Sequence, residues 1–304
     1  MSFDITEKNI KGLLIKTDAF IRTMYFVKHD LNLLPQKDHI CTCINFSDLI
    51  EMRDEFVKEL VVSVVDYVYS SKKSASIRQQ YIEEGRSISQ ANDLLSLKAK
   101  EKFRKSYIQG QFSEILLFLL LQHHFHGVPL LRKMPITTNP ALERNGADAY
   151  HICMMDSKVV LFLGEAKTYD REKYGLQSAL KDSIISILEH YKNHRSELNL
   201  YNYEEFIPEE LENIAADYLS GKRNDFEVHL VCLIAYDGKF DVQGKSRDEK
   251  LAFIVKVVKE ATTKIKPDIF KDIPKDLDLR FNYIIFPITS MQELLVNFRR
   301  KLTT

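Results

Sequence analysis

Cysteine and long apolar runs are scarce in this chain of 304 residues. The four cysteines lie in apolar, strand-like segments, so we expect buried thiols rather than a disulfide framework; they are Cys41, Cys43, Cys153 and Cys232. A zinc site would need a second ligand pair, which the first two cysteines lack. The longest apolar run, residues 115–121, is far shorter than the roughly 20 residues of a membrane-spanning helix. Since no N-terminal signal pattern is present, the sequence predicts a cytoplasmic protein without a membrane segment.

Net charge is also absent, because 43 lysines and arginines balance 43 aspartates and glutamates. Autonomous nucleic-acid binders usually carry a basic excess, so this balance excludes a strong overall attraction to phosphate backbones. The positive charge is concentrated in two places, and an acidic zone at residues 204–212 offsets it. The basic residues are Lys98, Lys100, Lys102, Arg104 and Lys105 on an expected helix, and Arg299, Arg300 and Lys301 near the end. Such runs are either solvated faces or binding surfaces. Neither Gly-x-x-x-x-Gly-Lys-Ser/Thr nor Gly-x-Gly-x-x-Gly occurs, which argues against a nucleotide pocket.

What the chain does contain is an apolar strand with charged residues at its tip. Five large apolar residues, 159–163, are followed directly by Gly164-Glu165-Ala166-Lys167. Because side chains alternate along a strand, Glu165 and Lys167 share one face. A turn at residues 156–157 predicts an antiparallel hairpin of residues 148–154 and 159–165. Asp148 then returns beside Glu165 at the open end of this hairpin.

Two carboxylates that converge in this way predict a cation site. Asp148 and Glu165 repel each other unless a cation or a proton lies between them, and oxygen ligands favour Mg²⁺ or Mn²⁺ over zinc. The backbone carbonyl of Ala166 would be a further ligand. A metal held by one or two carboxylates keeps several waters and binds phosphate, where it polarises a phosphoryl oxygen. Lys167 would orient the attacking water or offset the charge that builds up on the phosphorane.

The order of these residues resembles the PD-(D/E)xK nuclease motif, with Ala147 in place of the proline before Asp148. The flanking pattern agrees, since it predicts a helix over 110–126, a strand over 129–137, the hairpin, a helix over 171–194 and a strand over 226–236. The resemblance implies an α/β fold with a restriction-endonuclease-like core, a central mixed sheet flanked by helices, and an N-terminal α/β extension. It also implies Glu114 as a catalytic metal ligand and Gln177 as a residue near the scissile phosphate. Both have ordinary alternatives, because an acidic residue suits a helix start and a glutamine suits a solvated surface.

The remaining patterns divide the chain into an N-terminal α/β segment with the basic helix, residues 1–105, and a nuclease-like domain, residues 106–304. In the first part we expect strands over 12–16 and 39–46, a helix over 47–69 capped by Ser47, and a loop over 71–84. In the second part, Ser-x-x-Glu capping boxes at Ser246 and Ser290 predict two helices. A helix over 208–221 and a half-buried strand over 277–283 complete it. Capping or packing, rather than metal binding, is the role expected for His123, His124 and His126.

Over most of its length the chain resembles the HamA family, the nuclease subunits of Hachiman antiphage systems. The specific part of this likeness is Asp148 with Glu165-Ala166-Lys167. The resemblance implies a metal-dependent DNA endonuclease that works with a HamB-like partner helicase and degrades DNA non-specifically when it is released. Two alternatives share the same residues. One is a non-catalytic partner-binding module in which Lys167 and Glu165 form a structural ion pair, and the other is a site-specific restriction or repair nuclease.

Overall fold

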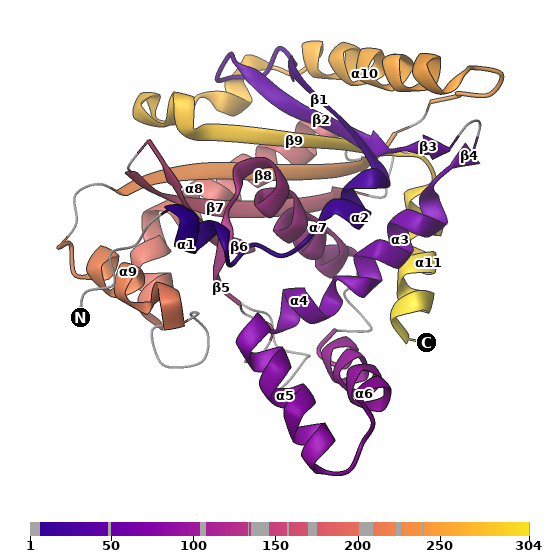
Figure 1. Cartoon of the computed structure of the whole chain (residues 1–304). Helices are drawn as coiled ribbons and strands as arrows, with labels where there is room; N and C mark the ends of the chain where they lie inside the picture. Colours follow the sequence, from indigo (N-terminus) through magenta and orange to yellow (C-terminus); the bar gives the residue numbers. More distant parts are fainter. Residues whose placement is uncertain are drawn as a thin grey trace.

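The computed structural model describes residues 7–47, 50–103, 108–132, 134, 146–156, 158–169, 175–200, 209–222, 226–238 and 240–303. Its centre is one seven-stranded sheet, drawn in Figure 1. In spatial order the strands are β1 (Met24–Asp30), β2 (Asp38–Ile44), β9 (Phe281–Ile288), β8 (Phe226–Asp237), β7 (Lys158–Tyr169), β6 (Ala149–Met155) and β5 (Val128–Leu131). The four middle strands β2, β9, β8 and β7 are parallel, and the outer strands are antiparallel to their neighbours.

Helices cover both faces of this sheet. One face carries α7 (Ile108–Phe125), α3 (Arg53–Val62) and α11 (Met291–Thr303), and the other carries α8 (Leu176–Leu200) and α10 (Arg247–Thr263). The strands between them are apolar on both sides, as expected for a parallel sheet covered twice. The predicted α/β fold with a central mixed sheet flanked by helices is therefore confirmed.

The remaining elements are short or lie at the periphery. They are α1 (Glu7–Lys11), α2 (Asp18–Arg22), α4 (Val64–Val68), α5 (Ser71–Glu83), α6 (Ile88–Lys100), α9 (Glu209–Leu219), a ribbon of β3 (Phe46–Ser47) and β4 (Ile50–Glu51), and 3-10 helices Pro267–Phe270 and Lys275–Arg280. In the described part of the chain, no helix has the length and apolar character needed to cross a membrane. All four cysteines are buried and free, as the sequence predicts.

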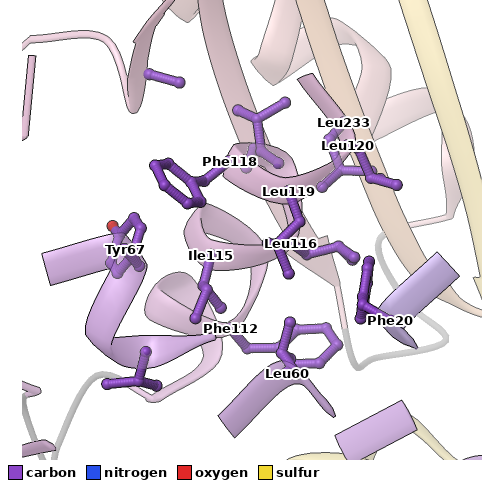
Figure 2. Packing of buried hydrophobic residues seen from close by; sticks show 14 of the residues in the cluster. Phe20, Leu60, Tyr67, Phe112, Ile115, Leu116, Phe118, Leu119, Leu120 and Leu233 are labelled. Carbon is purple, nitrogen blue, oxygen red and sulfur yellow. The ribbon is translucent and has the colours of Figure 1, made fainter. Parts of the chain in front are cut away.

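Helix α7 lies in the middle of the larger hydrophobic core and is buried nearly all round. Figure 2 shows Phe112 and Ile115 of this helix beside Leu60 of α3 and Tyr67 of α4. The Tyr67 ring stands edge-on to Phe118, with ring centroids 5.2 Å apart. This packing confirms the helix expected over residues 110–126 and fixes its position against β7.

The N-terminal elements differ from the sequence prediction. Residues 12–16 form no strand, because turn hydrogen bonds from Leu13 and Leu14 back to α1 continue the preceding helix. Strand β1 was not foreseen; it lies at the sheet edge and is only partly buried, so its sequence lacks a clear alternation. The single helix expected over residues 47–69 is also wrong. Ser47 belongs to β3, α3 begins at Arg53, and a break at Ser63 separates α3 from α4.

The loop expected over residues 71–84 is a helix, α5. Its N-cap is Ser70, whose hydroxyl accepts a hydrogen bond from the Lys73 N–H at 3.2 Å. The loop was predicted from the high content of serine and charged residues. Most of this helix faces solvent and only Ser74 and Ile77 are buried, so its sequence lacks an apolar stripe. Helices α5 and α6 pack together as a hairpin that projects from the body of the molecule (Figure 1).

The C-terminal predictions are confirmed in part. Ser246 and Glu249 form the expected capping box at the start of α10. Ser290 instead has a φ of 52°, outside the extended region that a serine N-cap adopts. The strand expected from residue 277 begins only at Phe281, because Leu277 lies in a 3-10 helix and Leu279 is 82% exposed. Strand β9 is buried on both faces rather than half-buried, because alternate residues pack into the hydrophobic cores on the two sides of the sheet.

Other boundaries shift without changing the element. The hairpin of β6 and β7 and the strand β8 are confirmed. Helix α8 extends to Leu200, beyond its predicted end at residue 194, and β5 ends at Leu131. Three predicted boundaries, Thr137, Arg171 and Pro208, lie outside the described residues. His123 and His124 pack against the Phe26 ring. The proposed division at residue 105 stays a prediction; β1 and β2 belong to the same sheet as β6 and β7.

Candidate active site

The candidate site lies where β7 extends past the end of β6. The last pair between these strands joins Ala149 to Gly164, while β7 continues to Tyr169 in contact with β8 alone. Asp148 immediately precedes β6, and its Oδ2 accepts a hydrogen bond from the Ala166 N–H at 2.8 Å. Ala166 pairs with Leu233 of β8 on one side, and on its other side the carboxylate takes the place of a β6 residue. The hairpin therefore fixes Asp148 beside Glu165, as the spacing predicts.

Glu165 is a buried carboxylate with two different oxygen environments. The residue is 2% exposed, and its Oε1 lies 2.6 Å from Lys167 Nζ, which confirms that both side chains share one face of β7. Within the described part of the structure, Oε2 is buried without a hydrogen-bond partner. A buried carboxylate oxygen that lacks a donor or a cation costs free energy. This oxygen is therefore a place where a cation would be stabilising.

A cavity of about 480 Å³ opens beside the tip of β7. It lies between the start of α7, the end of β7 and the C-terminal helix α11; the lining residues are Ile108, Gln109, Gly110, Ser113, Glu114, Asp148, Ala166, Lys167, Thr168, Tyr169, Gln292, Leu295, Val296 and Arg299. The Gln109 amide donates to the Thr168 carbonyl at 2.5 Å, which ties α7 to the strand tip. The cavity thus has one wall from the hairpin, which brings Asp148 and Lys167, and a second wall from α11.

Glu114 faces this cavity from the second turn of α7. The Tyr67 hydroxyl donates a hydrogen bond to Glu114 Oε2 at 2.9 Å and so orients the carboxylate. Helix α7 can lie close to β7 because Gly164 has no side chain. A Cβ there would lie 3.0 Å from Ala149 Cβ and 2.8 Å from Leu117 Cδ2. The glycine before Glu165 therefore sets how near Glu114 comes to the strand tip.

The basic residues around the cavity have different surroundings. Arg299 lines the cavity and is exposed; the Thr303 hydroxyl donates to its backbone carbonyl, but its guanidinium has no hydrogen-bond or ion-pair partner among the described residues. Lys100 on α6 donates to the Lys301 carbonyl at 3.3 Å, so the expected basic helix contacts the end of α11. Lys98 lies 6.0 Å from the centre of the Tyr81 ring, and Arg104 and Lys105 fall outside the described residues. The guanidinium of Arg299 is thus available to an anion in the cavity.

Four of the expected site residues line the cavity, namely Glu114, Asp148, Ala166 and Lys167, and Glu165 lies behind Lys167. The structure does not bring Gln177 to them, because its Oε1 accepts a hydrogen bond from the Lys266 N–H at 3.2 Å, at the start of a 3-10 helix. Across the described ranges, no three His, Cys, Asp or Glu residues are grouped closely enough to form a metal site by themselves. A Mg²⁺ ion held by one or two carboxylates and several waters does not need such a group.

Sequence reasoning missed a second polar group, which lies behind Glu165 on α8. His190 Nδ1 lies 2.9 Å from Glu197 Oε1, and His190 Nε2 lies 3.7 Å from Glu165 Oε2. Glu197 Oε2 also accepts hydrogen bonds from the Tyr150 hydroxyl and, at 3.1 Å, from the Ala147 N–H. The signal was present in the sequence, because His190 and Glu197 continue the apolar stripe of α8 at helical spacing. Polar residues in a buried stripe need partners.

The comparison with known families covers all of these residues. The HamA family model matches residues 19–302, which include the cavity lining and the polar residues of α8. No curated protein and no solved structure matches the chain. The match therefore extends over the whole sheet and is not confined to the β6–β7 hairpin.

Proposed function

Since this chain belongs to the HamA family, whose members are components of Hachiman defence systems, we propose that it is a metal-dependent DNA endonuclease of the PD-(D/E)xK type. One observation carries the proposal. Asp148 accepts the Ala166 N–H next to the buried Glu165, Lys167 is paired to Glu165, and both Asp148 and Lys167 line the cavity. Carboxylates with an adjacent lysine at the mouth of a cavity suit hydrolysis of a phosphodiester.

The donor set fits a hard divalent cation, Mg²⁺ or Mn²⁺. The ligands would be Asp148, Glu165 through its unpartnered Oε2, and the carbonyl of Ala166, with Glu114 as a further carboxylate from α7. All of them are oxygen donors, which these two ions prefer. When bound, the cation would supply Lewis acidity to the scissile phosphate and neutralise part of its charge.

The chain's own residues have distinct tasks in this proposal. Lys167, released from Glu165, would orient the attacking water and offset the charge on the phosphorane. Arg299 would hold a neighbouring phosphate of the DNA strand, because an arginine fork matches phosphate oxygens. Tyr67 would keep Glu114 turned toward the cavity. Any contact of Gln177 with DNA would have to be made outside the cavity.

A partner would deliver the DNA. The chain has no net charge, so its own attraction to a phosphate backbone is weak. We propose that a HamB-like helicase brings DNA to the cavity and restrains cleavage until it is activated. Cleavage would then be non-specific, because a cavity open to the strand backbone reads phosphates rather than bases.

One alternative has an observation in its favour. The 2.6 Å pair between Lys167 and Glu165 is the structural ion pair that a non-catalytic partner-binding module would keep. The two possibilities differ in what the pair does when Mg²⁺ is present. In a nuclease Glu165 would hold the cation and Lys167 would be free to act on the phosphate, whereas in a binding module the pair would persist and Mg²⁺ would not bind.

Plasmid nicking by the full-length protein, purified alone and with its partner helicase, separates these possibilities. We expect nicking of supercoiled DNA with Mg²⁺ and none with EDTA. Asp148→Asn and Glu165→Gln should lose nicking and still copurify with the helicase, while Glu189→Gln, an exposed change on α8, should behave as wild type. Wild-type nicking by Asp148→Asn or Glu165→Gln, or no Mg²⁺-dependent nicking by the wild type either alone or in the complex, would reject the nuclease.

A further inference from the structure

The polar group on α8 has no place in the chemistry described so far, yet it contacts both halves of the acidic site. We propose that Glu197 and His190 are positioning residues that hold Asp148 and Glu165 in register with each other and thereby set the affinity for the divalent cation. The proposal rests on the metal site proposed above. It assigns no contact with substrate to either residue.

Glu197 fixes the chain on both sides of Asp148. Its Oε2 accepts the Ala147 N–H at 3.1 Å and the Tyr150 hydroxyl, and these two residues stand immediately before Asp148 and immediately after Ala149, the first residue of β6. The Glu197 side chain is 15% exposed, so water competes little for these bonds. Asp148 therefore sits on a piece of backbone that is anchored to α8 at both ends.

The same carboxylate orients His190. Burial raises the pKa of Glu197, but hydrogen bonds from His190 and Tyr150 outweigh it and lower the pKa to about 2. Glu197 is therefore ionised at neutral pH and can only accept hydrogen bonds. His190 Nδ1, 2.9 Å from Glu197 Oε1, must then carry its hydrogen and donate it. The ring is thus fixed in one orientation.

The other edge of the His190 ring faces Glu165. Its Nε2 lies 3.7 Å from Oε2, the Glu165 oxygen that has no hydrogen-bond partner in the described structure. The ring is too far away to form a hydrogen bond with this oxygen, but it occupies the space on the α8 side of the carboxylate. In this proposal it limits movement of the Glu165 carboxylate away from Lys167 and the cavity mouth.

Helix α8 makes the two contacts interdependent. His190 and Glu197 lie two turns apart on one face, separated by about 10 Å along the helix axis. The helix packs against β7 and β8, so it is held to the strand that carries Glu165. Partners of this kind, which orient metal ligands without touching the metal, typically change metal affinity or activity about 10- to 100-fold when they are removed.

A direct metal-binding measurement tests this inference apart from cleavage. The full-length protein is titrated with Mn²⁺, and the free ion is followed by electron paramagnetic resonance; the thermal midpoint of each variant is recorded beside it. Glu197→Gln should bind Mn²⁺ about 10- to 100-fold more weakly than wild type while still unfolding cooperatively. Glu189→Gln on the exposed face of α8 is the matched control and should bind as wild type.

Two substitutions at His190 distinguish the contact made by its Nδ1 from the contact made by its Nε2. Asparagine can place an amide near Nδ1 and keep the bond to Glu197, whereas glutamine can place one near Nε2 and keep the contact with Glu165. We therefore expect His190→Gln to retain more Mn²⁺ affinity than His190→Asn. Tyr150→Phe removes only a hydroxyl and carries the test if Glu197→Gln does not fold; it should weaken Mn²⁺ binding as well.

The outcomes separate this inference from the proposed function. If wild type binds Mn²⁺ while Glu197→Gln, His190→Asn and Tyr150→Phe bind it equally well, the positioning role is wrong and the metal site stands. If folded wild-type protein binds no Mn²⁺ at all, the metal site is wrong and the positioning role is rejected with it. Weaker binding in folded variants, with the control unchanged, supports both.

Discussion

Glu197 should make the stability of this protein fall in acid by a predictable amount. Its pKa is lowered from an ordinary 4.5 to about 2 in the folded chain, where His190 and Tyr150 donate to it against the opposing effect of burial. A carboxylate whose pKa is lowered by folding stabilises the folded state above its unfolded pKa. That stabilisation is lost as the pH falls from about 4.5 toward 2.

The magnitude follows from the two pKa values. A fall from 4.5 to about 2 corresponds to about 3 kcal/mol of unfolding free energy at neutral pH. About 1 kcal/mol of this should be gone at pH 4 and about 2 kcal/mol at pH 3. Other carboxylates titrate in the same range, so the informative quantity is the difference between wild type and Glu197→Gln.

Urea unfolding at pH 7, 4 and 3 measures this difference. We expect wild type to be more stable than Glu197→Gln by about 3 kcal/mol at pH 7 and by about 1 kcal/mol at pH 3. Glu189→Gln should show no such dependence, because Glu189 is exposed. A stability difference between wild type and Glu197→Gln that stays constant from pH 7 to pH 3 would refute the reasoning about this carboxylate.

Three further predictions concern the cavity. Lys167→Arg should lose most nicking activity and keep Mn²⁺ binding, because a guanidinium keeps the charge but not the compact donor; near-normal nicking would show that charge suffices. Arg299→Gln should reduce the slope of log DNA affinity against log salt concentration by about 1, and an unchanged slope in this variant would show that Arg299 does not contact DNA phosphate. Lys98→Gln in the same assay tests whether α6 also contacts phosphate. Gly164→Ala should destabilise the fold by about 1–3 kcal/mol in urea unfolding, because the new Cβ would lie 3.0 Å from Ala149 Cβ. An unchanged unfolding midpoint would show that the strands move apart enough to accommodate the methyl group.

The acidic tip was predictable because its pattern is local. An apolar run of strand length that ends in Glu165-Ala166-Lys167 leaves few arrangements, and the turn at Asp156 brings Asp148 back at a fixed register. The relation between Asp148 and Glu165 therefore follows from counting residues along two strands. The helix of Glu114 was predictable for a similar reason, since Phe112, Ile115, Leu116, Leu119 and Leu120 recur at helical spacing.

Contacts between distant segments could not be predicted in this way. The role of Glu197 depends on how α8 lies against β6, which no spacing reveals. Strand β1 is an edge strand with little alternation, and α5 buries so few residues that its composition resembles a loop. Gln177 stands at the expected place in the sequence, but the start of α8 is turned so that its amide meets Lys266.

The pairing of β2 with β9 determines when a newly made chain can become complete. Cys41 pairs with Ile285, and α3 packs against α11, so the centre of the sheet joins the first part of the chain to the last. Until β9 leaves the ribosome, β2 and β8 each keep an open edge, and α11 with Arg299 is missing from the cavity wall. At about 5–20 residues per second, synthesis from Lys167 to Arg299 takes about 7–26 seconds. A nascent chain therefore carries its acidic hairpin for some time without the wall opposite it, and the full cavity arises only after α11 has been made.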